Sequence, residues 1–111
     1  MSQREIYIKV IDEEKHKTRL LAHCQKYTAS IASYHKVLLP EYKNEVAELF
    51  VNYIRQCASS ASSRNSYATV CNLIVMCENA CPGATAKVRA EITQKYARRP
   101  AFMEEMRKIG N

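Results

Sequence analysis

The fold is decided by residues 41–106, and most clearly by the end of that stretch, Tyr96-Ala97-Arg98-Arg99-Pro100-Ala101-Phe102-Met103. Three consecutive helical patterns lead into the Tyr-x-Arg-Arg-Pro turn, and a short amphipathic tail follows it. Proline ends the preceding helix and suits the first turn of the next, where a backbone N–H has no intrahelical acceptor. The stretch therefore predicts an all-helical packing module, and it contains no pattern that specifies a reaction.

Helical spacing continues on the N-terminal side of this stretch. Apolar residues recur every three or four positions over residues 20–38, 41–61, 65–80 and 84–96, which is the repeat of one helix face. The helix at 65–80 is apolar nearly all round, so we expect it to be buried at the centre. Residues 6–11 fit both a strand alternation and a helix face, and their helical neighbours favour the helix.

Residues 20–38 fit one long helix or two shorter helices with a break at Thr28-Ala29-Ser30, and we favour the break. Further breaks are expected at Pro40, at residues 59–66 and at Cys81-Pro82-Gly83. Thr28 is a candidate N-cap, because its hydroxyl can accept a hydrogen bond from a free backbone N–H. Pro40 is expected to close one helix and to open the next at its first turn.

Residues 1–111 are thus predicted to form a single all-α domain of about six to seven helices. Because the turns are short, consecutive helices should pack as antiparallel hairpins. Hairpins of this size laid side by side predict a tetratricopeptide-like right-handed solenoid fragment. The strict tetratricopeptide signature, with its Trp and Leu-Gly, is absent, so any repeat is structural and degenerate.

The net charge of +6 lies mostly in the second half of the chain. Residues 1–50 carry eight Lys and Arg against seven acids, and residues 51–111 carry nine against four. A basic half favours an anionic partner, but a solubilising helix face gives the same count. The absence of a secretory signal and an odd number of cysteines, five, favour a reducing cytoplasm. The longest apolar run, residues 73–77, is far below the ~18 residues of a membrane helix.

A family resemblance follows from four segments of the sequence. They are Leu39-Pro40-Glu41-Tyr42, residues 45–50, Ser66-Tyr67 and the stretch from Tyr96 to Met106. Together these segments resemble the helical region that follows the metal-binding motif in bacterial SWIM zinc-finger proteins. The resemblance covers roughly residues 5–109 and implies a tetratricopeptide-like array without catalytic residues. The family's zinc motif, Cys-x-Cys followed by Cys-x-His, is absent. The chain would then be the C-terminal piece of a larger protein, or a relative without the metal module.

Metal binding and nucleophilic catalysis are both poorly supported by the sequence. Only Cys77 and Cys81 have the spacing of a zinc-ligand pair, and no second such pair exists. Cys57 is expected opposite residue 67, which leaves Cys71 about 6 Å further along its helix, so buried apolar packing explains these cysteines best. His35 is expected beside Tyr34 at a helix edge, and no oxyanion-hole element accompanies any Cys–His pair. We predict no catalytic residue, no metal ligand and no cofactor.

The best candidates for contact with an anion or a partner are basic residues near the C-terminal end: Lys87, Arg89, Lys95, Arg98 and Arg99. Cations at a helix C-terminus also complement the helix dipole, which is a purely structural explanation. The sequence therefore favours a non-enzymatic helical module that binds a protein or peptide. The alternative is a nucleic-acid-associated module that uses these residues together with Arg55 and Arg64. A membrane role is not expected, and the oligomeric state is not indicated.

Overall fold

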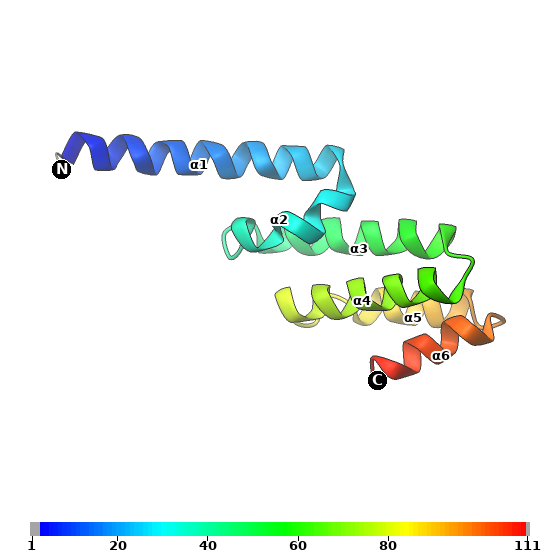
Figure 1. The fold of residues 1–111 in the computed structure, drawn as a ribbon. Coiled ribbons are helices and arrows are strands. Elements are labelled where there is room, and N and C mark those ends of the chain that lie inside the picture. The colour runs from blue at the N-terminus through cyan, green and yellow to red at the C-terminus, as the bar shows by residue number, and fades with distance from the viewer. Residues whose placement is uncertain (1–2, 111) are drawn as a thin grey trace.

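The computed structural model describes residues 3–110, with the side chains of residues 15–110, and every regular element in this part is helical. The described chain forms six α-helices: α1 (Gln3–Lys26), α2 (Ile31–Leu38), α3 (Lys43–Ser60), α4 (Arg64–Ala80), α5 (Ala86–Lys95) and α6 (Pro100–Lys108) (Figure 1). A 3₁₀ turn, η1 (Thr28–Ser30), joins α1 to α2. The all-α prediction is confirmed, and residues 6–11 belong to a helix rather than a strand.

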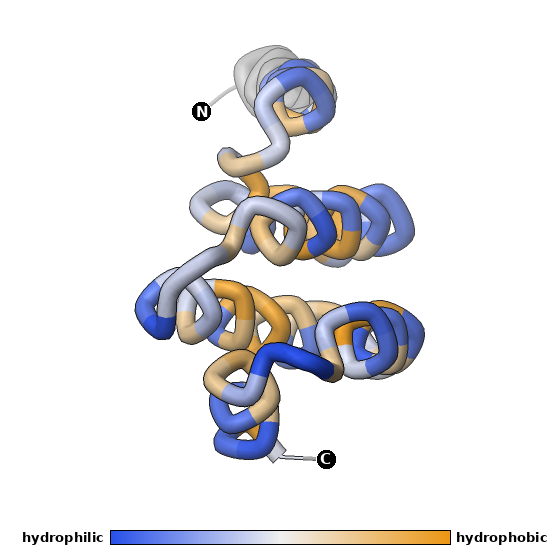
Figure 2. The backbone as a smooth tube through the Cα atoms, turned by 90° about the vertical axis from the view of Figure 1, so that its right-hand side faces the viewer, coloured by the Kyte–Doolittle hydropathy of each residue, from blue (hydrophilic) through white to orange (hydrophobic). Residues whose placement is uncertain are grey.

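The helices form two layers. In one layer α2 contacts α4 and α4 contacts α6, while in the other α5 packs on α3. Helices α3 and α4 run antiparallel across a short turn, and their hydrophobic residues gather where the two helices meet (Figures 1 and 2). This order of contacts is the one that stacked helical hairpins require. The right-handed superhelix of a tetratricopeptide-like solenoid stays a prediction.

Helix α4 supplies much of the core. The predicted side of α4 is buried, and Leu73 is buried as well; the buried residues are Tyr67, Val70, Cys71, Leu73, Ile74 and Cys77. Val75 and Met76 remain 38% and 37% exposed. Helix α4 therefore lies between its neighbours, as expected, but it is not buried on every side. Helices α3 and α6 cover one side of α4, and α2 has only eight residues with which to cover the other.

Local sequence signals fix both ends of α4. At its start the Ser63 hydroxyl accepts a hydrogen bond from the Ser66 N–H, and the Ser66 hydroxyl accepts one from the Ser63 N–H at 2.8 Å. This reciprocal capping box satisfies two donors that the first turn leaves free. After its end, Gly83 has a φ of 89°, which other residues rarely adopt. The Gly83 N–H donates to the Glu78 carboxylate at 2.8 Å, which closes the turn.

The break near residue 28 is confirmed, but its details differ from the prediction. Thr28 does not cap α2, because its hydroxyl donates to the Gln56 side chain of α3 at 3.1 Å. Pro40 does not open α3, which begins three residues later, at Lys43. The 3₁₀ turn also shifts the helical phase, so Tyr27 and Tyr34 are exposed. The apolar row of residues 20–38 therefore does not form one continuous buried face.

Stacked aromatic rings hold α6 against α4. Phe102 is fully buried, and its ring lies on that of Tyr67, with ring centroids 4.5 Å apart and planes at 14°. Tyr96 also stacks on Phe102, with ring centroids 5.4 Å apart. Pro100 occupies the first turn of α6, as predicted. Large aromatic faces that meet in this way contribute both buried area and a favourable ring–ring geometry.

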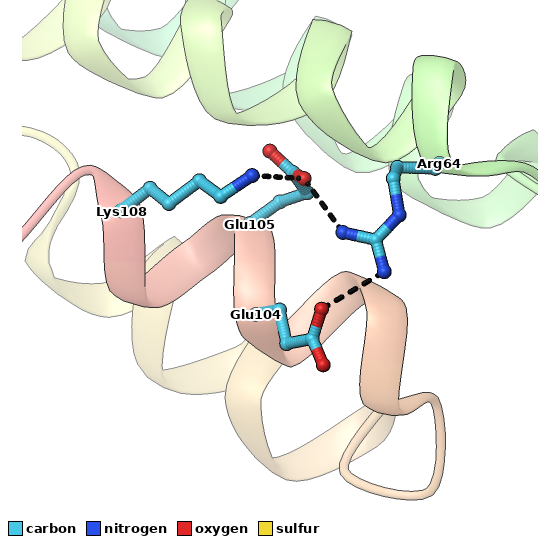
Figure 3. A network of polar contacts seen from close by, with 4 residues as sticks. All are labelled: Arg64, Glu104, Glu105 and Lys108. Atoms are coloured by element: carbon cyan, nitrogen blue, oxygen red, sulfur yellow. Dashed lines mark hydrogen bonds and ion pairs between the residues drawn. The ribbon is translucent and has the colours of Figure 1, made fainter.

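Charged side chains close the same junction from outside (Figure 3). The Arg64 guanidinium at the start of α4 donates to Glu104 at 2.8 Å and to Glu105 at 3.1 Å. Lys108 donates to the same oxygen of Glu105 at 2.9 Å. The hydrogen bond from Lys108, and also that from Arg64, lowers the pKa of the Glu105 carboxyl, although burial acts in the opposite direction. Glu105 therefore pairs both with Arg64 of α4 and with Lys108 of its own helix.

A charge placed on the buried side of α4 should unfold the domain. The Ile74 side chain is only 1% exposed, so Ile74→Asp should cost more than about 4 kcal/mol of a total stability of roughly 5–15 kcal/mol. Val75→Asp makes the same change one residue later, where the carboxylate reaches water, and should cost less than about 1 kcal/mol. Thermal unfolding followed by circular dichroism compares the two variants, and equal melting would show that the core is misplaced.

Replacement of Glu105 should make the stability of the domain less dependent on pH. Because the folded state lowers the pKa of this carboxyl, its stabilising effect is complete above the ordinary value of 4.5 and is lost as the pH falls below it. Urea midpoints at pH 7 and pH 3 should therefore differ less for Glu105→Gln than for the unchanged protein. Glu104→Gln, at a side chain that is 52% exposed, is the matched control and should keep the original difference. The same pH dependence in all three proteins would refute this role of Glu105.

Candidate binding groove and the predicted contact residues

A groove with a volume of about 770 Å³ opens between α2 and α4. This volume lies within the range that ligand sites in proteins typically have. The lining is largely apolar and includes both exposed apolar residues of α4. The lining residues are Ala32, Ser33, His35, Lys36, Leu39, Val75, Met76, Asn79 and Ala80.

The sequence of α4 explains why apolar side chains line this groove. Five consecutive apolar residues, 73–77, must point in all directions, since each residue of a helix advances by about 100°. Leu73, Ile74 and Cys77 fill the buried side of the helix. Val75 and Met76 are left on the groove side, where α2 does not cover them completely. The run of five apolar residues was visible in the sequence, but the position of α2 beside it was not.

His35 is the polar residue of the groove that the sequence analysis misplaced. Its side chain is buried, with 6% exposed, and does not lie at a helix edge beside Tyr34. Its Nδ1 atom lies 3.1 Å from the carbonyl oxygen of Ile31 and 3.0 Å from that of Ala32. Its ring meets the ring of Phe50 edge-on, with centroids 5.0 Å apart. The spacing from Ile31 to His35 to Leu38 is that of one helix face, and this signal could have placed His35 in the core.

The five basic residues predicted to contact a partner have different surroundings. Arg99 donates to the Ala61 carbonyl oxygen at 2.8 Å and lies over the Tyr96 ring, 5.1 Å from its centroid. Lys95 lies over the same ring at 5.6 Å. Arg89 donates to the Gly110 carbonyl oxygen.

The remaining two members of that group, Lys87 and Arg98, are exposed. Part of the basic group therefore makes contacts within the domain. The binding role of the five residues stays a prediction.

Two further arginines were considered for nucleic-acid binding, and both form ion pairs within the chain. Arg55 binds the Glu91 carboxylate with two hydrogen bonds of 2.9 and 3.0 Å, which join α3 to α5. Arg64 bridges Glu104 and Glu105, as described above. A phosphate group would have to compete with these carboxylates for both guanidinium groups. This competition weakens the nucleic-acid alternative, which stays an untested prediction.

The cysteines are free thiols, and four of them are buried: Cys24, Cys71, Cys77 and Cys81. Burial raises the pKa of the Cys71 thiol to about 11 and that of Cys77 to about 12. The sulfur of Cys71 lies 3.6 Å from that of Met106, which is an apolar packing contact. A thiol with a raised pKa forms little thiolate near neutral pH and is a poor nucleophile.

The described residues show neither a metal-ligand cluster nor a membrane-spanning helix. The described side chains contain no group of three or more His, Cys, Asp and Glu residues arranged to hold a metal ion. None of the described helices combines the length and the apolar character needed to cross a membrane.

Comparisons of the chain with protein-family models, with curated proteins and with solved structures found no match. The interpretation of the groove therefore depends on its own geometry and chemistry.

Thiol labelling should follow burial. Cys57 is half-buried and should react first with an aromatic disulfide reagent at pH 8, whereas Cys71 and Cys77 should react only when the domain unfolds. Mass spectrometry after timed quenching identifies the labelled residue, and Cys57→Ser should remove the early phase. Rapid labelling of Cys77 in the folded protein would contradict its placement in the core.

Proposed function

We propose that this protein is a non-catalytic helical module that binds a partner protein through the groove between α2 and α4. The observation that carries the proposal is the exposure of Val75 and Met76 side by side in a groove of about 770 Å³. Adjacent exposed apolar side chains that line a concave surface are typical of interaction sites.

The occupant that fits best is an amphipathic helix. The groove is bordered by α2 on one side and α4 on the other, so its long direction can follow their axes. A docked helix places apolar residues at i, i+3, i+4 and i+7 into such a groove. Val75 and Met76 would then contact the apolar side of the docked helix.

Charge favours an acidic partner. Among the described residues, Lys36 is the one formally charged member of the groove lining, and this described lining contains no acidic residue. The whole chain has a net charge of +6, which attracts an acidic protein over a longer range. The partner helix should therefore carry Glu or Asp on the side that faces Lys36.

Two further elements of the proposal concern family and location. The resemblance to the helical region of SWIM zinc-finger proteins is compatible with a binding module, and it remains a prediction. We also place the protein in the reducing cytoplasm, because all five cysteines are free thiols.

A synthetic acidic helix provides the first test. A peptide with leucines at i, i+3, i+4 and i+7 and glutamates on its flanks should shift the methyl resonances of Val75 and Met76. Met76→Glu should weaken binding at least about tenfold, or 1.4 kcal/mol, because it removes an apolar anchor and introduces a charge that repels the peptide.

Two controls accompany this titration. Val37→Glu changes a side chain on α2 that is 43% exposed and lies outside the groove lining, so it should leave the affinity within about twofold. A peptide with lysine flanks should bind more weakly than the acidic peptide. Unchanged methyl resonances, or equal losses for Met76→Glu and Val37→Glu, would refute the proposed site.

A further inference from the structure

The contacts of His35 determine which of its ring nitrogens carries a proton. Nδ1 lies within hydrogen-bond distance of the carbonyl oxygens of Ile31 and Ala32. A carbonyl oxygen only accepts hydrogen bonds, so Nδ1 must be the donor to both. In the neutral imidazole Nε2 then carries a lone pair and no proton. The backbone of α2 thereby fixes the tautomer of its own histidine.

The second nitrogen, Nε2, is accessible to solvent. No described residue forms a hydrogen bond with Nε2. Thr85 Oγ1 is the only described buried side-chain polar atom that is both sealed from solvent and without a partner, so Nε2 is not sealed. His35 belongs to the groove lining, while its ring is held against Phe50. The groove therefore contains a hydrogen-bond acceptor that is held in a fixed position among apolar walls.

A ligand in the groove either pairs with this acceptor or leaves it without a hydrogen bond. In the free protein Nε2 can accept a hydrogen bond from water. An apolar side chain placed over it would remove that water and leave a buried acceptor unpaired, which opposes binding. A group with an N–H or O–H at the same position would replace the water without this loss.

We propose that the groove is selective for an acidic amphipathic helix whose apolar side carries one hydrogen-bond donor, received by Nε2 of His35. This inference rests on the proposed function and adds the chemistry that distinguishes one helix from another. His35 is the specificity-determining residue, Val75 and Met76 supply apolar contact, and Lys36 attracts the acidic flank.

Two small probes of the same shape isolate this hydrogen bond. Indole has one N–H donor, and 1-benzothiophene has a sulfur atom in its place. At pH 8 both should shift the methyl resonances of Val75 and Met76. Indole alone should shift the ¹⁵N resonance of His35 Nε2, and it should bind roughly fivefold more tightly, which is the value of one net hydrogen bond.

His35→Phe is the matched variant, since it keeps a ring against Phe50 and removes the acceptor. It should bind both probes equally. Because the probe pair is compared first in the unchanged protein, the inference remains testable even if this variant folds poorly.

Each outcome has a distinct meaning. Equal affinity of the two probes with an unmoved Nε2 resonance would overturn the role of His35 and leave the groove as a binding site. A ¹⁵N spectrum in which Nε2 carries the proton would also overturn it. If neither probe nor the acidic helix moves the methyl resonances of Val75 and Met76, the proposed function fails as well.

Discussion

The structure depends on one buried row of side chains along α4, from Tyr67 to Cys77. This row gives α3 and α6 a shared surface on which to pack, and the stack of Tyr67 on Phe102 sets the position of α6. Burial of such side chains is the main favourable contribution to folding, and no other described helix contacts three others as extensively as α4 does. The ion pairs of Arg64 lie outside this row and refine an arrangement that the apolar contacts already determine.

Much of the helical architecture could be predicted from the sequence, because it depends on local signals. The 3.6-residue spacing, the serines before residue 67, Pro82-Gly83 and Pro100 marked the helices of the C-terminal half. Predictions failed where a tertiary contact or a change of helical phase decided the outcome. Thr28 bonds to Gln56 of another helix instead of capping its own, and the 3₁₀ turn rotates Tyr27 and Tyr34 out of the core. Neither effect is encoded in the spacing of apolar residues alone.

The candidate groove was harder to predict than the fold. Its apolar wall comes from Val75 and Met76, whose exposure depends on how α2 packs beside α4. The sequence drew attention to basic residues instead, and Arg99 and Arg89 turn out to donate to backbone carbonyl groups within the domain. The position of His35 could be predicted only in part. Its spacing from Ile31 indicates burial, but its orientation toward Phe50 and the groove can be known only from the packed structure.

The central claim is that α4 has two apolar sides, one that holds the fold together and one that is left open for a partner. Solvent paramagnetic relaxation of methyl groups measures this directly, because a soluble paramagnetic agent reaches only side chains near water. The methyl groups of Val75 and Met76 should relax strongly, while those of Val70 and Ile74 should be protected. Equal relaxation of all four residues, whether strong or weak, would contradict the account.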